Sequence, residues 1–142
     1  MTVLIRDQGF VPEDWHGGFT ALEDLEHALD APLALDLPND VDIARLAPLL
    51  PRLHLIRIAF PVFSDGRGFT LARLLRLAGY RGRLRAHGAL LADQYTMLRR
   101  AGFDEVEIPE TLALRQPEQQ WLARADWRGH NYQRRLRQND RL

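Results

Sequence analysis

The sequence of 142 residues contains no cysteine and no lysine. Without cysteine, the chain has no disulfide, no thiolate metal site, no cysteine-ligated iron–sulfur cluster and no redox thiol. Without lysine, the strongly basic side chains are all arginines, and they balance the acidic ones to a formal net charge of zero. Nonspecific nucleic-acid binding depends on surplus cations, so we expect no nucleic-acid partner.

Long apolar runs are missing as well. The first ten residues mix Arg6, Asp7 and Gln8 with apolar residues, which is not the pattern of a signal peptide, and no run is long enough to span a bilayer. We therefore expect a cytoplasmic protein with no membrane partner.

Metal and cofactor motifs are also absent. The sequence has neither a Walker A loop nor a dinucleotide-binding fingerprint, so we predict no cofactor. Four histidines show no metal-ligand spacing, so we predict no metal; they are His16, His27, His54 and His130.

The length fits one domain, predicted over residues 1–142. Residues 1–30 are interpreted as an N-terminal extension and residues 126–142 as an arginine-rich tail. From Arg115 onward the chain carries seven arginines against three carboxylates. A solvated or partner-binding tail fits this excess better than a nucleic-acid site, because the total charge is neutral.

Apolar runs alternate with helical patterns from about residue 31 onward, which predicts four successive βα units with a mainly parallel sheet, an α/β fold. The predicted strands are Leu33–Leu37, Leu55–Phe60, Arg83–Gly88 and Glu105–Ile108. The predicted helices are Val41–Leu50, Thr70–Ala78, Leu90–Ala101 and Pro117–Ala125. Gly79 and Gly102 are expected to end two of these helices in the left-handed conformation.

The residues before the first βα unit predict a helix and a candidate strand. Thr20 and Glu23 have capping-box spacing, which predicts a helix over Ala21–Leu29. Val3–Ile5 is a candidate edge strand, and Asp7–Gly9 is expected to turn the chain back.

Side-chain alternation along the predicted strands separates an apolar face from a polar one. The polar face carries Asp36, Arg57, Arg85, His87 and Glu107. Central strands of a doubly wound sheet are apolar on both sides, so the alternation favours a half-barrel-like sheet with helices mainly on one face. A doubly wound flavodoxin-like sheet is the alternative.

Two interpretations of this polar face remain open. In the first, Asp36 and Glu107 neutralise the arginines in a network of ion pairs. In the second, Arg57 and Arg85 hold an anion and His87 donates a proton.

The segment Phe60–Thr70 is the strongest local signal, because Gly66 and Gly68 flank Arg67 just before a predicted helix. Such glycines allow a tight turn or a close approach of the backbone to an anion at the helix start. With Asp65 as a capping residue and Arg67 paired to an acid, the same segment is a structural turn.

The runs FPVFSDGRGFTLARLLR, GYRGRLRAHG, LLADQYTMLRRAGFD and VEI cover residues 60–108 in order. They resemble the bacterial family called domain of unknown function 934, while the first fifty and last thirty residues match loosely. The chain departs from the family pattern at Arg83, where an acid is common, and at Ala101, where a cysteine is frequent.

The resemblance implies an accessory protein of assimilatory sulfite reduction, in sulfate assimilation and cysteine biosynthesis. Members of the family are typically encoded beside the sulfite reductase hemoprotein and are described as probable oxidoreductases. This chain has no catalytic cysteine or cofactor fingerprint to support that description. The alternative is a non-catalytic homodimeric interaction module that docks a reductase subunit.

We expect any binding site to lie in the segments that follow parallel strands. The candidate residues for an anion such as sulfite or sulfate are Asp65, Arg67, Arg85, His87, Asp93 and Gln94. Asp93 and Gln94 can equally be capping or packing residues of the next helix. Because four βα units leave the sheet edges open, we also expect a homodimer.

Overall fold

The computed structural model describes residues 1–27 and 33–128. Its strands are β1 (Thr2–Arg6), β2 (Gly9–Val11), β3 (Thr20–Ala21), β4 (Leu33–Leu37), β5 (Leu53–Phe60), β6 (Arg83–Gly88) and β7 (Glu105–Pro109). They form one sheet in the order β2-β1-β7-β6-β5-β4-β3. Strands β3 to β7 are parallel, whereas β1 is antiparallel to both β2 and β7. The predicted mainly parallel α/β fold is confirmed.

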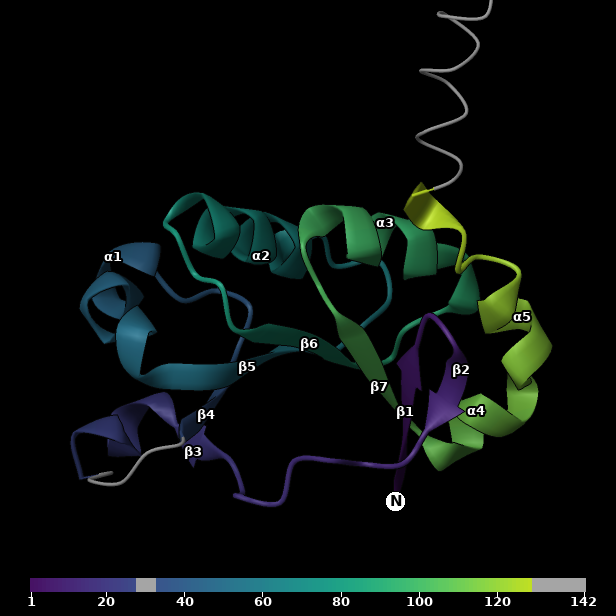
Figure 1. Ribbon diagram of the computed structural model, residues 1–142, viewed down its shortest axis with the longest axis horizontal. Helices are drawn as coiled ribbons and strands as arrows, with labels where there is room; N and C mark the ends of the chain where they lie inside the picture. Colours follow the sequence, from purple (N-terminus) through teal and green to yellow (C-terminus); the bar gives the residue numbers. More distant parts are fainter. Residues whose placement is uncertain (28–32, 129–142) are drawn as a thin grey trace, which may run out of the picture.

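The α-helices are α1 (Ile43–Leu46), α2 (Arg67–Leu77), α3 (Tyr95–Ala101), α4 (Glu110–Arg115) and α5 (Glu118–Leu122). Within the described residues they are accompanied by the 3-10 helices η1 (Leu22–His27), η2 (Ala47–Arg52) and η3 (Ala92–Gln94). Helices α1, α2 and α3 all lie over one face of the sheet, and α4 and α5 lie beside β1 and β2 (Figure 1). A doubly wound sheet would divide its crossover helices between both faces, so the half-barrel-like arrangement describes the fold better.

The hydrophobic core lies between the sheet and these helices. Alternate residues of the strands point into it, as the period of two predicts. Its fully enclosed members from the sheet are Ile5, Leu35, Ile56, Ile58, Phe60, Leu84, Ala86, Val106 and Ile108. From the helices it receives Leu46, Ala72, Leu75, Tyr95 and Leu98.

Several predicted helix boundaries are explained by proline and glycine. The helix predicted over Val41–Leu50 is α-helical only to Leu46 and continues as η2, which contains Pro48 and Pro51. Proline lacks the N–H that an α-helix needs, so the chain winds more tightly there. Gly79 and Gly102 have φ angles of +98° and +119°, the left-handed conformation expected after α2 and α3.

Other predictions need correction near both ends of the chain. The strand at Val3–Ile5 is not an edge strand, because β1 lies between β2 and β7, although Asp7 and Gln8 do form the turn into β2. Strand β3 and helix α4 were not predicted, since two and six residues are too short for a periodic signal. The helix predicted over Ala21–Leu29 is η1, and its last two residues lie outside the described part.

Helix α2 begins at Arg67, three residues before the predicted Thr70, whereas two other predicted helices are shorter than their patterns suggested. The region Leu90–Ala101 begins with η3 at Ala92 before α3, and Pro117–Ala125 contains α5 over Glu118–Leu122. Most of the predicted arginine-rich tail, residues 129–142, lies outside the described residues.

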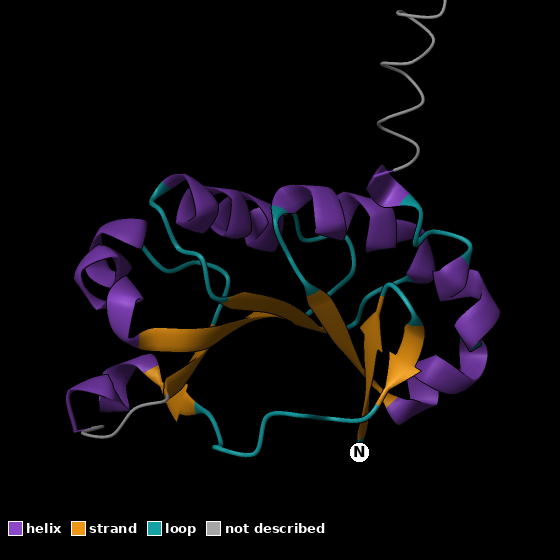
Figure 2. Cartoon of the chain, viewed as in Figure 1, coloured by secondary structure: helices purple, strands orange, loops and turns teal. Residues whose placement is uncertain are grey.

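Residues 12–19 form a segment that crosses the face of the sheet opposite α1, α2 and α3. This crossing segment connects β2 at one edge of the sheet to β3 at the other, without regular secondary structure (Figure 2). It therefore covers the polar face that the alternation predicted.

Gly68, in the first turn of α2, contacts the ring of Phe60. A Cβ at Gly68 would lie 2.4 Å from Phe60 Cζ. The Phe60 ring is fully buried, and its centroid lies 5.3 Å from that of Phe69 and 5.8 Å from that of Phe103. Because the ring is enclosed by these neighbours, it has little room to move away.

We predict that Gly68→Ala lowers the free energy of unfolding by about 1–3 kcal/mol, the range for overpacking a well-filled core. Gly66→Ala is the matched control, because a Cβ at Gly66 would meet nothing within 4 Å. Chemical denaturation of both variants measures the difference. Equal stability of the two variants would contradict the packing role of Gly68.

Candidate functional site

The register of the parallel strands places the charged residues of the polar face side by side. Asp36 on β4 is paired with Arg57 on β5, and Arg57 is paired with Arg85 on β6. Arg85 is paired in turn with Glu105 on β7, and His87 with Glu107. Four neighbouring strands therefore build one continuous charged row.

Arg85 is the centre of this row and is fully buried. Its Nε donates to Glu105 Oε2 at 2.6 Å, and its Nη1 donates to Glu107 Oε1 at 2.9 Å. Glu13 of the crossing segment accepts two further hydrogen bonds from Nη1 and Nη2, both at 2.7 Å. Three carboxylates thus surround one guanidinium.

The neighbouring arginines are paired in the same way. Arg57 donates to both oxygens of Asp36, at 3.2 and 2.8 Å, and to Glu107 at 3.2 Å. Arg83 Nη2 donates to Glu105 at 2.7 Å and to Asp14 at 2.9 Å.

Asp14 and Glu105 also bind Arg6, which lies on β1. The Arg6 guanidinium is 2.8 Å from Asp14 and 3.0 Å from Glu105. The polar face, the crossing segment and β1 therefore bring together four arginines, Arg6, Arg57, Arg83 and Arg85. Their partners are five carboxylates, Glu13, Asp14, Asp36, Glu105 and Glu107. With His87 neutral, negative charge is in excess by one.

The crossing segment adds an aromatic contact to these ion pairs. The Cζ atom of Arg57 lies 3.8 Å from the ring centroid of Phe19, and that of Arg85 lies 5.6 Å from it. A ring stacked on a guanidinium shields the ion pairs beneath it from water and attracts the cation.

These contacts shift the pKa values of the charged groups. Burial alone would raise the pKa of Asp36, but hydrogen bonds from His87 and Arg57 outweigh it and lower the pKa well below its usual range. Burial opposes ionisation of Glu107 too, and Arg85 and Arg57 lower its pKa. The hydrogen bond from Arg85 lowers the pKa of Glu13. Asp36, Glu107 and Glu13 are therefore held in the ionised form.

The second group of candidate residues lies in the β5–α2 loop, residues 61–66. Asp65 accepts hydrogen bonds from the Nε and Nη2 of Arg67, at 3.0 and 2.7 Å, and from Asn39 Nδ2 at 2.9 Å. Hydrogen bonds from Arg67 lower the pKa of Asp65. The Arg67 side chain remains 63% exposed, so its pairing with Asp65 is open to solvent.

The last two candidates, Asp93 and Gln94, make contacts in different parts of the structure. Gln94 caps η3 by accepting from Leu91 N at 2.8 Å, and its Nε2 donates to the carbonyl oxygen of Phe63 in the β5–α2 loop at 2.7 Å. Asp93 is exposed and pairs with Arg124 at 2.8 Å.

The six candidate residues therefore fall into three groups rather than one site. Arg85 and His87 belong to the polar face, where His87 Nε2 lies 3.5 Å from Asp36. Asp65 lies in the β5–α2 loop, with Arg67 and Gln94 next to it, and Asp93 lies apart from both groups. Anion binding by these residues stays a prediction.

The sequence interpretation missed several members of the ion-pair network. Glu105 shares the strand parity of Glu107, so the alternation could have identified it. Glu13, Asp14 and Phe19 lie in a segment without periodicity, and no local signal indicates that it crosses the sheet.

Within residues 1–27 and 33–128, no group of three or more metal-ligating side chains is positioned to hold a metal ion. Among the helices of the same residues, none combines the length and apolar character needed to cross a membrane.

Fold and site together define an α/β protein with a mainly parallel sheet, helices over its apolar face and a polar face whose charges are paired internally. Residues 34–142 match the family model described as "Bacterial protein of unknown function (DUF934)". The match covers well over half of the chain, so the protein belongs to this family, as the resemblance implied. No curated protein and no solved structure matches the chain.

We predict that Arg85→Met lowers the free energy of unfolding by about 3–5 kcal/mol, because it leaves buried carboxylates without their shared partner. Arg67→Ala is the matched comparison and should leave the melting temperature nearly unchanged. Asp65 would keep Asn39 and the backbone N–H of Arg67 as donors. Thermal and chemical denaturation measure both effects, and a variant at Arg85 as stable as the one at Arg67 would contradict the central role of Arg85.

The lowered carboxyl pKa values predict an acid-dependent loss of stability. Unfolded carboxyls titrate near pH 4, whereas Glu13, Asp36 and Glu107 keep their charge to lower pH in the native state. As the pH falls below about 5, the unfolded state binds protons that the native state does not, so stability decreases. Melting temperatures between pH 7 and pH 3 should show this fall, and Glu107→Gln should be less stable at neutral pH but show a shallower decrease. Parallel curves for the two proteins would rule out a contribution from Glu107.

Proposed function

We propose that this protein is a cytoplasmic accessory protein of assimilatory sulfite reduction, within sulfate assimilation and cysteine biosynthesis, that acts by docking a reductase subunit. Membership of the family supports the link to sulfite reduction, which the resemblance implies. The internally paired polar face supports docking over chemistry, because its arginines are occupied by carboxylates and the chain has no cysteine. The proposal assigns no catalytic residue.

The observation that carries the docking proposal is the apolar tip of the β5–α2 loop. Val62 and Phe63 are 52% and 54% exposed. An exposed aromatic side chain is a common anchor of protein interfaces, where it fills a pocket on the partner. The tip lies at the carboxyl end of β5, inside the segment on which the resemblance rests.

The loop holds this tip in a fixed shape before any partner binds. Asp65 N donates to Val62 O at 3.2 Å, and Gln94 Nε2 donates to Phe63 O at 2.7 Å. Asn39, two residues after the end of β4, donates a hydrogen bond to the Asp65 carboxylate. Because the backbone is already ordered, less conformational entropy is lost on binding.

We predict that Phe63→Ser weakens binding of the sulfite reductase hemoprotein by at least about tenfold, the effect of truncating an aromatic anchor. The backbone hydrogen bond at Phe63 does not depend on its side chain, so the fold is kept. Leu114→Ser is the control, because Leu114 on α4 is 79% exposed and lies outside the loop. Titration of purified reductase with both variants measures the difference, and equal weakening by both, or no binding by the wild type, would refute the proposal.

A homodimer that buries the same tip on both copies is the alternative form of this proposal. The outer strands β2 and β3 are three and two residues long, and Phe10 N of β2 donates to Glu118 on α5 at 2.9 Å. An edge strand that is very short, as both are, or covered, as β2 is, needs no second copy to close it. Light scattering at high micromolar concentration separates the two forms, since the homodimer requires twice the monomer mass.

Small-anion binding at Arg67 is the second candidate function, supported by the exposure of its guanidinium at the start of α2. In this case sulfite or sulfate raises the melting temperature of the wild type and not of Arg67→Ala. The absence of any ligand effect on the wild type removes this candidate and leaves the docking proposal unchanged.

A further inference from the structure

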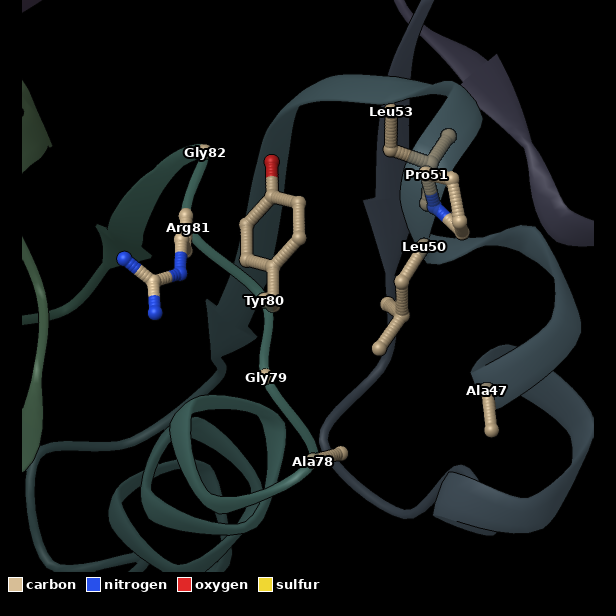
Figure 3. A pocket seen from close by; sticks show the side chains of 9 residues that line it. All are labelled: Ala47, Leu50, Pro51, Leu53, Ala78, Gly79, Tyr80, Arg81 and Gly82. Carbon is tan, nitrogen blue, oxygen red and sulfur yellow. The ribbon is translucent and has the colours of Figure 1, made fainter.

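A solvent-open hollow of about 640 Å³ lies at the amino-terminal ends of β5 and β6, away from both groups of candidate residues. The Tyr80–Gly82 segment forms one of its walls. The same segment borders a second hollow of about 390 Å³, lined by Leu50, Pro51 and Leu53. In Figure 3 the guanidinium of Arg81 and these three apolar residues lie on opposite sides of the Tyr80 ring.

The backbone on both sides of Arg81 is held in place by one side chain, Arg76. Its Nη1 donates to the carbonyl oxygens of Tyr80 and Gly82, at 3.0 and 2.8 Å. Its Nε and Nη2 donate to Gly102 O at 3.0 and 2.8 Å, and Nη2 also donates to Asp104 at 2.9 Å.

Gly82 allows the chain to pass close to Tyr80. A Cβ at Gly82 would lie 2.3 Å from Tyr80 Oη, which donates to Arg83 O at 3.2 Å. These contacts hold the backbone of the Tyr80–Gly82 segment in place, and the side chain of Arg81 is exposed to solvent.

Hydrogen-bond donors remain available in this hollow. Arg81 is exposed, and within residues 1–27 and 33–128 its guanidinium has no hydrogen-bond or ion-pair partner. Arg83 binds its carboxylate partners within these residues through Nη2 alone, so its Nε and Nη1 remain available to donate hydrogen bonds. His54, also exposed, has no partner within the same residues.

The charge of the hollow is positive. The charge of Arg76 is compensated by Asp104 at 2.9 Å, and that of Arg83 by Glu105 at 2.7 Å. The charge of Arg81 has no such compensation among the described residues. An anion in the hollow would therefore meet an unneutralised guanidinium, unlike an anion at the polar face, where carboxylates are in excess.

We infer that this hollow binds the phosphate or sulfate group of a small-molecule ligand through Arg81, Arg83 and His54. Arginine donates two parallel hydrogen bonds to such oxyanions, and its fork geometry makes these contacts strong and directional. The hollow is open to solvent, so it has room for an ester as well as for the free ion. The inference is independent of the proposed docking function.

The test is an NMR titration of the full chain with inorganic phosphate, inorganic sulfate and phenyl phosphate, against a sodium chloride titration of equal ionic strength. We expect saturable shifts at the amides of Arg81 and Gly82 and at the His54 ring. Arg81→Ala should weaken binding at least about tenfold, the loss of a charge-assisted hydrogen bond. Arg73→Ala, at an exposed arginine of α2, is the control and should bind as the wild type does.

Each outcome decides the inference. Tighter binding of phenyl phosphate than of the inorganic ions identifies an ester as the ligand class, and equal binding identifies the free ion. Shifts reproduced by chloride, or shifts lost in Arg67→Ala but kept in Arg81→Ala, overturn it. Arg81 makes no contact that the fold needs, and Arg81→Gln provides a second variant that keeps the stem of the side chain.

Discussion

The ion-pair network around Arg85 is the interaction on which the rest of the structure depends. A buried guanidinium is tolerated only where its charge and its donors are matched, and Glu13, Glu105 and Glu107 supply that match from two separate segments. Two of these carboxylates come from β7, and the third comes from the crossing segment. The network therefore couples the register of the parallel strands to the path of residues 12–19.

This coupling explains how a sheet with helices over one face can exist without a second layer of helices. The opposite face would expose a row of backbone and charged groups, and the crossing segment covers it with Glu13, Asp14 and Phe19. Carboxylates from outside the sheet thus take the place that an apolar helix face takes in a doubly wound fold. The polar face is consequently a structural feature of the fold, and the guanidinium groups of Arg57 and Arg85 at its centre are occupied by carboxylates.

Sequence periodicity predicted the parts of the fold that depend on local patterns. The strands at Leu33–Leu37 and Arg83–Gly88 have the predicted limits, because both alternate cleanly and end at turn residues. The pairing of Asp36 and Glu107 with the arginines of the polar face also matches one of the two interpretations of the alternation.

The rest of the candidate site depends on contacts between residues far apart in the chain. Glu13 and Arg85 are 72 positions apart, and no local pattern encodes their contact. The same holds for Gln94 and Phe63, whose hydrogen bond joins η3 to the β5–α2 loop. Because such contacts follow from the assembled sheet, the sequence could name candidate residues but could not group them.

Three arginines show why the residue type alone does not identify an anion site. Arg85 is surrounded by carboxylates, and Arg76 uses Nε and both terminal nitrogens on three carbonyl oxygens and Asp104. Both arginines therefore have structural roles, although the sequence alone does not distinguish them from Arg81. What distinguishes Arg81 is that the bonds of Arg76 fix its backbone while its own donors remain without a partner in the described residues. In a chain whose net charge is zero, unpaired donors on a fixed backbone, rather than an excess of arginine, mark the place where an anion can bind.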